Sequence, residues 1–246
     1  MNKLRIYKGI NYDDMSRKAA SFIQAQLNVK PESVLGLATG SSPVGLYDVL
    51  VQHYKDGEVD FSRTKTVNLD EYKGLPPDNE QSYRYFMQKH LFSRVNIDIA
   101  NTYVPNGLAV NPDEECARYD CVIERLGGID LQLIGIGNNG HIGFNEPADD
   151  FPVKTHLAQL AQKTVEANKR FFKNIDEVPR AAFTMGIGAI MSAAAVLLIV
   201  SGKEKAAILK ESFYGPVTPR IPASVLQFHR NVILVADSDA LSLFPA

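Results

Sequence analysis

Strand-like and helical patterns alternate along the whole of this chain. Short apolar runs predict strands at residues 4–8, 33–38, 64–69, 131–135, 182–185, 195–201 and 231–236. Amphipathic patterns and capping residues predict helices at residues 11–27, 44–54, 81–92, 111–126 and 203–213. Parallel strands need a long crossover connection, which is usually a helix. The order therefore predicts an α/β fold with a mostly parallel, Rossmann-like sheet in three layers and helices on both faces.

The chain is long enough to form this fold as one domain. It has 246 residues, 45% of them hydrophobic, and it contains no internal repeat or Gly/Ser-rich linker. We therefore expect a single domain over residues 1–246. Residues 148–180 lack a clear apolar period and carry several lysines and arginines. This long polar stretch predicts a helical lid over a binding site, with a solvated helical excursion as the alternative.

Charge and composition exclude several classes of partner. The net charge is −2, so the chain as a whole has no basic footprint for nucleic acid. The longest apolar run, Ala193–Val200, is far shorter than the roughly 18 residues that cross a bilayer. Cys116 and Cys121 point in different directions on one predicted helix, so we expect neither a disulfide nor a cysteine-based metal site. The N-terminus lacks a signal-peptide core, and we expect a reduced, cytoplasmic protein.

A glycine-dense loop follows the strand predicted at 131–135. Residues 135–147 read GIGNNGHIGFNEP and hold four glycines together with His141 and Glu146. Each glycine costs backbone entropy on folding, so this density indicates that something approaches the backbone closely. Ligands of open α/β sheets bind just past the carboxyl ends of strands. The loop therefore predicts a proton carrier, His141, with the Glu146 carboxylate near it. A tight turn with a surface histidine is the alternative.

A second loop, Thr39-Gly40-Ser41-Ser42, lies between a buried strand and the start of a helix. Glycine lets backbone N–H groups converge, the hydroxyls add donors, and the helix N-terminus favours an anion. Neither a Walker pattern nor a GxGxxG run is present, so a phosphate monoester fits better than a nucleotide. An ordinary hydroxyl-rich turn would have the same sequence.

Three further side chains extend the predicted site. Asp70 closes the strand predicted at 64–69 and would be a proton acceptor if partly desolvated, although a turn or capping aspartate is equally compatible. Arg170 and Lys205 are cations that could grip a phosphate, or could be solvated surface residues. The five histidines are scattered, and we expect no metal site.

These segments, taken in order, resemble the glucosamine-6-phosphate deaminases. The resemblance runs through nearly the whole chain, and several separate motifs carry it. They are LGLATGSSP at 35–43, NLDEY at 68–72, GLP at 74–76, SY at 82–83, the 135–147 loop, VP at 178–179, TMGIG at 184–188 and GKEKA at 202–206.

The resemblance implies conversion of glucosamine 6-phosphate and water to fructose 6-phosphate and ammonia, without a metal or organic cofactor. Asp70 matches the base that moves a proton from C2 to C1. His141 matches the residue that opens the pyranose ring, and Glu146 matches its carboxylate partner. The positions that match the phosphate grip are Ser41, Ser42, Arg170 and Lys205, beside Thr39 and Gly40 of the same loop.

Two departures from the family pattern affect these expectations. Many members have an aspartate at the position of Asn139, so here Glu146 alone would hold an imidazolium, with Asn139 as an orienting residue. Allosteric members bind N-acetylglucosamine 6-phosphate through a serine, an arginine and a lysine, where this chain has Asp149, His156 and Ala158. They also have a longer C-terminal tail. We therefore expect no activation by that effector, and a monomer.

Two other functions share part of this pattern. The 6-phosphogluconolactonases resemble the chain in fold and in the glycine-histidine loop, but tend to have Ser-Leu-Phe-Pro where this chain has Phe144-Asn145-Glu146-Pro147. A sugar-phosphate sensor without catalytic activity would need the Thr39–Ser42 loop, called the anion loop below, but not Asp70, His141 and Glu146.

Overall fold

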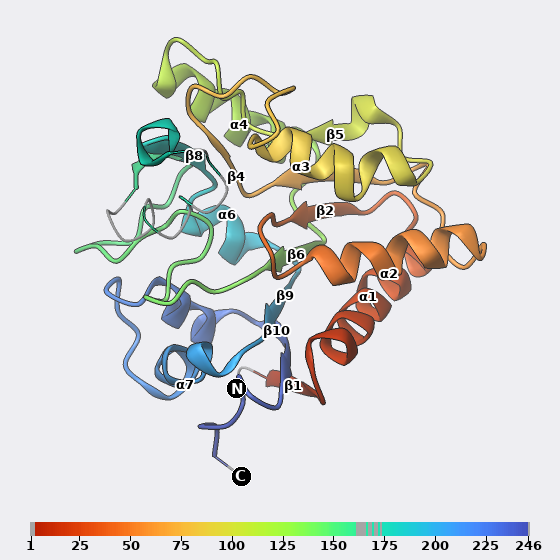
Figure 1. Ribbon diagram of the computed structural model, residues 1–246, viewed down its shortest axis with the longest axis vertical. Helices are drawn as coiled ribbons and strands as arrows, with labels where there is room; N and C mark the ends of the chain where they lie inside the picture. Colours follow the sequence, from red (N-terminus) through yellow and green to blue (C-terminus); the bar gives the residue numbers. More distant parts are fainter. Residues whose placement is uncertain (1–2, 161–165, 167–168, 170–171, 173, 246) are drawn as a thin grey trace.

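The computed structural model describes residues 3–160, 166, 169, 172 and 174–245. Its central feature is a seven-stranded sheet in which every pair of neighbouring strands is parallel, in the order β1-β10-β9-β6-β2-β3-β5 (Figure 1). The strands are β1 (Lys3–Gly9), β2 (Val34–Leu37), β3 (Lys65–Asn68), β5 (Thr102–Tyr103), β6 (Leu131–Ile134), β9 (Ala195–Val200) and β10 (Asn231–Asp237). The predicted α/β architecture is confirmed.

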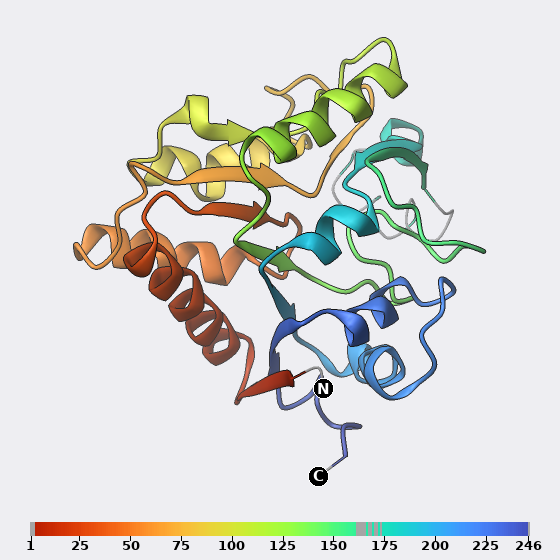
Figure 2. The same cartoon turned by 180° about the vertical axis from the view of Figure 1, so that it is seen from behind.

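Helices cover both faces of this sheet (Figures 1 and 2). Helices α1 (Tyr12–Val29) and α2 (Val44–Lys55) pack side by side on one face, and α3 (Tyr83–His90) adjoins α2. Helices α4 (Pro112–Arg125), α6 (Ile187–Ser192) and α7 (Ala206–Tyr214) lie on the other face. The division follows from right-handed crossovers, because connections from β1 to β5 run one way along the sheet and those from β5 to β10 run the other.

The reversal in strand order falls between β2 and β6. The chain leaves β2 towards β3 and leaves β6 towards β9, so the two following loops diverge at the carboxyl ends of neighbouring strands. Ligands of open α/β sheets bind in the crevice that such a divergence creates. These two loops are the anion loop and the glycine-dense loop predicted from the sequence.

A second, three-stranded sheet stands beside these loops. It is antiparallel, in the order β4-β8-β7, and consists of β4 (Asp70–Tyr72), β8 (Ala181–Thr184) and β7 (His156–Gln159). The strand predicted at 182–185 is thus real, but it pairs with β4 and not with the parallel sheet. The prediction of a helical segment over residues 148–180 was wrong at His156–Gln159, which form strand β7. Short, half-exposed strands such as β7 have too little apolar pattern to be distinguished from loop sequence.

The remaining elements are short. They are the 3₁₀ turns η1 (Phe92–Arg94), η2 (Ile99–Asn101), η4 (Ile175–Glu177), η5 (Lys203–Lys205) and η6 (Pro222–Phe228), together with β4, β5 and α6. Apart from η5, which falls within the helix predicted at residues 203–213, they were not predicted, because so few residues carry no clear period. Whether residues 148–180 act as a lid stays a prediction, because residues 161–165, 167–168, 170–171 and 173 lie outside the described chain.

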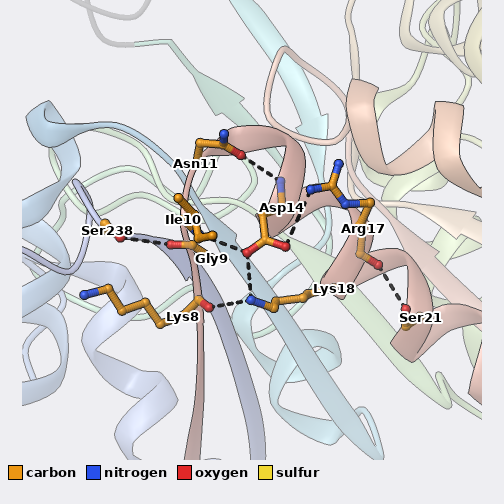
Figure 3. Close-up of polar contacts among 9 residues, drawn as sticks. All are labelled: Lys8, Gly9, Ile10, Asn11, Asp14, Arg17, Lys18, Ser21 and Ser238. Atoms are coloured by element: carbon orange, nitrogen blue, oxygen red, sulfur yellow. Dashed lines mark hydrogen bonds and ion pairs between the residues drawn. The ribbon is translucent and has the colours of Figure 1, made fainter.

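Polar contacts fasten the start of α1 to β1 (Figure 3). The Asn11 side chain caps the helix by accepting the N–H of Asp14 at 3.0 Å. The Asp14 carboxylate accepts the Ile10 N–H at 3.0 Å and binds Lys18 Nζ at 2.7 Å, and Nζ also donates to Lys8 O. These bonds fix the direction in which α1 leaves the sheet. They thereby place Tyr12, the first residue of α1, beside the anion loop.

The two cysteines on α4 are free thiols, Cys116 buried and Cys121 exposed. Within the described residues, no helix has both the length and the apolar character needed to span a bilayer.

The buried centre of the sheet depends on close contact between β2 and β6. Gly36 of β2 lies opposite Gln132 of β6, and a Cβ atom at Gly36 would fall 2.0 Å from Gln132 Oε1. Gln132 is fully buried, so its side chain has no solvent-filled space to move into. Glycine at this position allows the long glutamine to cover the neighbouring strand.

We expect Gly36→Ala to lower the free energy of unfolding by roughly 1–3 kcal/mol, because overpacked cores must shift to accept added atoms. Chemical denaturation measures the loss. The double variant Gly36→Ala, Gln132→Ala removes the obstructing side chain and should show positive coupling relative to the sum of the single variants. Purely additive losses would contradict this account of the contact.

Candidate active site

A large cavity lies at the reversal between β2 and β6. Its volume is about 920 Å³, which exceeds that of a hexose phosphate, and the β2–α2, β3–β4 and β6 loops and α3 all contribute to its wall. The polar and aromatic residues that line it include Thr39, Gly40, Ser41, Ser42, Asp70, Tyr72, Tyr83, Lys89, His90, Asn139, His141, Phe144, Phe172 and Lys205. Asp70 and His141 are therefore on the same side of the sheet.

The anion loop is shaped by Gly40 and braced from α1. Gly40 has φ +91°, a conformation that L side chains rarely adopt, and it turns the chain from β2 into α2. The Tyr12 hydroxyl donates to Ser41 O at 3.1 Å and accepts the Gly45 N–H at 2.8 Å. Ser41 is exposed to the cavity side and Ser42 is half-buried. The loop is thus held in shape before any ligand arrives, which favours binding of an anion at the start of α2.

Lys205 contributes a cation to the wall of the same cavity. Lys205, in η5 after β9, lines the cavity, and its Nζ donates to Ile136 O at 2.8 Å. The contact directs the lysine towards the glycine-dense loop and the anion loop. Arg170, the other predicted phosphate ligand, lies outside the described residues.

The glycine-dense loop holds the His141 ring flat against its own backbone. A Cβ atom at Gly137 would lie 2.2 Å from both Cε1 and Nε2 of His141, so only glycine fits beneath the ring. The Gly137 N–H donates to His141 O at 2.9 Å and closes the loop. This contact is the close approach that the density of glycines predicted.

Behind the ring, Glu146 and Asn139 form a polar pair. Asn139 Nδ2 donates to Glu146 Oε2 at 2.7 Å, and Asn139 Oδ1 accepts the His141 N–H at 3.2 Å. Glu146 Oε2 is 3.5 Å from His141 Nδ1, which has no hydrogen-bond partner among the residues that the structure describes. Glu146 is outside the cavity wall. The arrangement lets the carboxylate stabilise a protonated ring while Asn139 fixes the direction of the carboxylate.

Asp70 is the buried acid of the cavity. Its exposed fraction is 6%, and burial together with the neighbouring Glu71 charge raises its pKa to about 8. A Cβ atom at Gly143 would lie 3.6 Å from Asp70 Oδ2 and 2.9 Å from Thr184 Oγ1, so the histidine loop passes directly over the acid. Asp70 is the first residue of β4, whereas the sequence predicted that it closes the preceding strand.

Two buried side chains fasten the histidine loop to the small sheet. Thr184 Oγ1 accepts the Phe144 N–H at 3.0 Å, and Thr184 pairs with Asp70 across β4 and β8. Asn145 Nδ2 donates to Met185 O at 2.9 Å and to Ile142 O at 2.8 Å. The Met185 N–H in turn donates to Leu69 O at 2.7 Å. Acid and imidazole are therefore held by one continuous network.

Aromatic rings close the side of the cavity beside Asp70. Tyr72 packs against Tyr83 with ring centroids 4.8 Å apart and against Phe144 at 5.7 Å, and Phe172 meets its edge at 6.1 Å. Burial raises the pKa of both tyrosines, with the Asp70 charge acting in the same direction. This apolar wall keeps water from the acid, which is why its charged form is disfavoured.

Sequence reasoning missed the supporting residues of this site. Tyr12 lies far from every motif, and nothing in its local sequence indicates a contact with Ser41. Tyr72 and Tyr83 stand inside quoted motifs, yet a pattern cannot show that they pack together. The two adjacent acids of β4 point in different directions: Asp70 lines the cavity and Glu71 faces α3. No group of three or more metal-binding side chains gathers among the described residues.

Comparison with known proteins shows the family of this chain. The family model of glucosamine-6-phosphate isomerases/6-phosphogluconolactonase matches residues 11–235. The chain belongs to this family. A glucosamine-6-phosphate deaminase of Lachnoclostridium phytofermentans is 55% identical over 232 residues, covering 94% of this chain and 98% of that protein. A glucosamine-6-phosphate deaminase of Clostridium perfringens is 53% identical over 240 residues, covering 98% and 99%.

Solved structures of both branches of this isomerase/lactonase family share the fold of this chain. A monomeric glucosamine-6-phosphate deaminase superposes with a TM-score of 0.95 at 40% identity, covering 98% of this chain and all of that one. The 6-phosphogluconolactonase of Thermotoga maritima gives a TM-score of 0.74 at 20% identity, covering 96% of this chain and 100% of that one. The lactonase likeness shows the shared fold alone.

The buried acid has a consequence for stability. Because the pKa of Asp70 is raised on folding, the folded state holds its proton more tightly than the unfolded chain. The stability associated with the protonated acid is present below pH 4 and is lost as the pH rises towards 8. We expect Asp70→Asn to be more stable than the wild type at pH 8–9, by at least about 1 kcal/mol, and closer to it at pH 5. Denaturant unfolding at both pH values measures this, and an equal difference at the two would contradict it.

Proposed function

We propose that this chain converts glucosamine 6-phosphate and water to fructose 6-phosphate and ammonia. The observation that supports this best is the presence of a buried acid, an imidazole with a carboxylate behind it and an anion loop in one cavity. The 50–55% identical relatives named glucosamine-6-phosphate deaminase support the same reaction.

Phosphate binding orients the sugar. In this proposal Thr39, Gly40, Ser41 and Ser42 receive the phosphate at the start of α2, with Lys205 and Arg170 as cations. The energy of binding this remote group is used to hold the reacting carbons in place. The braced loop, which Tyr12 holds in shape, supports this role because little ordering is left to occur on binding.

Ring opening follows at the histidine loop. His141 takes the proton of the anomeric hydroxyl and returns it to the ring oxygen, which gives the open-chain aldehyde. Glu146 stabilises the transient imidazolium, and Asn139 keeps the carboxylate turned towards the ring. The neutral Asn139 adds no charge, so Glu146 supplies the electrostatic part alone.

Proton transfer at carbon is the task of Asp70. The carboxylate removes the C2 proton of the open-chain aldehyde to give an enolamine and delivers it to C1. Water then adds to the resulting C2 iminium, and ammonia leaves as the ketone forms. The sequence is redox-neutral, and we propose that no cofactor takes part. An acid with a raised pKa is suited to this step, because a stronger base removes a carbon-bound proton more readily.

We further propose that the protein acts as a monomeric, single-domain cytoplasmic enzyme without a nucleic-acid partner. The structural similarity to a monomeric deaminase supports the oligomeric state.

The first test is ammonia release. Asp70→Asn should lower kcat by about 10²-fold or more with glucosamine 6-phosphate, because the amide cannot accept the C2 proton. A coupled ammonia assay measures this. Asp113→Asn, which changes an exposed aspartate of α4 away from the cavity, should keep the wild-type rate. Unchanged ammonia release in Asp70→Asn would remove this residue from the mechanism.

The second test concerns regulation. Asp149 pairs with Arg220, His156 Nδ1 contacts Lys154 O at 3.0 Å, and Ala158 is buried in β7. The position of the effector-binding serine thus carries an acid that repels phosphate. We expect N-acetylglucosamine 6-phosphate to leave the substrate saturation curve unchanged. A clear shift of that curve to lower substrate concentration would refute the prediction.

A further inference from the structure

The carboxylate of Glu71 is buried next to that of Asp70 but faces away from the large cavity. Its exposed fraction is 2%. It borders a separate, smaller cavity of about 250 Å³, together with Arg84 and residues 102–107. Neither the ring-opening step nor the proton transfer requires this second acid. A buried carboxylate without a role in binding or chemistry is costly, so its contacts show what it contributes.

Three backbone N–H groups converge on Glu71. Its Oε1 accepts the N–H of Tyr72 at 2.8 Å and of Tyr83 at 2.9 Å, and its Oε2 accepts the N–H of Arg84 at 3.0 Å. Both oxygens thus act as acceptors, which is the arrangement that favours the ionised form. Burial raises the pKa of Glu71 to about 7, and the three N–H groups act in the opposite direction.

Two of these N–H groups are the first of α3, which begins at Tyr83. A helix N-terminus has unsatisfied donors, and a carboxylate there satisfies them and interacts favourably with the helix dipole. Helix α3 carries Tyr83, Lys89 and His90 in the wall of the large cavity. Because Glu71 follows Asp70 in β4, its contacts fix this wall relative to the base.

The Glu71 charge also acts directly on Asp70. The titratable groups around the two acids are Tyr72 on β4, Tyr83 and Arg84 on α3 and Tyr119 on α4, with His141 and Lys205 in the same cavity as Asp70. The guanidinium of Arg84 lies on the Glu71 side, where Nη1 binds Thr102 O and Oγ1. A negative charge beside Asp70 therefore makes Asp70 a stronger base.

We propose that Glu71 is a positioning residue for the base: it fastens α3 to β4 and keeps a negative charge beside the Asp70 carboxyl. The inference rests on the proposed deaminase function, because it is read out through the activity of Asp70.

The test is the pH profile of kcat/KM for ammonia release from glucosamine 6-phosphate. Its acid limb reports protonation of the base in the free enzyme. Glu71→Gln removes the neighbouring charge, so the limb should move to lower pH by roughly one unit. A limb that coincides with that of the wild type would overturn the inference. If the wild type itself releases no ammonia, the proposed function fails instead.

Two further variants separate charge from structure. Ser82→Ala removes the side-chain cap of α3, where Ser82 Oγ accepts the Tyr85 N–H at 3.0 Å, but leaves both acids in place. It should keep the wild-type limb, and a shift as large as that of Glu71→Gln would overturn the charge effect. Arg84→Gln removes the cation that favours the ionised form of Glu71, so less negative charge stands beside Asp70 and the limb should move to lower pH, in the same direction as in Glu71→Gln. This shift remains measurable if Glu71→Gln does not fold, and an unchanged or raised limb in Arg84→Gln would then overturn the proposal.

Discussion

The reversal of chain direction between β2 and β6 is the constraint on which the rest of this protein depends. Parallel strands bring all their carboxyl ends to one edge of the sheet, and the loops after these two neighbours must separate. One loop becomes the start of α2, where an anion is favoured, and the other carries His141. Neither loop needs to be long, because the sheet itself brings them together.

The small antiparallel sheet adds what the parallel sheet cannot supply, which is a dry place for an acid. Asp70 lies at the junction of the two sheets, under the histidine loop and against an aromatic wall. Such burial costs stability, since a charged carboxylate in an apolar setting is disfavoured. The same burial makes the Asp70 carboxylate a stronger base. At this one residue, burial therefore lowers the stability of the folded protein and raises the reactivity of the carboxylate. Glu71 increases both effects while it satisfies the first N–H groups of α3.

Glycines at this site serve backbone contact more than flexibility. Gly137 leaves room for the His141 ring, and Gly143 lets the loop pass over Asp70 and Thr184. A methyl group at Gly137 would collide with the ring, and one at Gly143 would lie only 2.9 Å from Thr184 Oγ1. The density of glycines in the loop therefore reflects how closely the loop backbone packs against His141 and Thr184, and this is why the feature could be recognised before the fold was known.

The sequence by itself determined the fold class, the two loops at the carboxyl ends of β2 and β6, and the chemical types at the site. These features depend only on neighbouring residues. They are apolar runs long enough to be buried, helix caps such as Asn11, and local glycine-rich motifs. The tertiary structure alone decided how Tyr12 braces Ser41, how Glu71 caps α3, and that β7 is a strand within a stretch predicted to be helical. These features depend on contacts between distant segments or on short, half-exposed strands. A local pattern carries no information about either, because the energy that selects them comes from the partner segment.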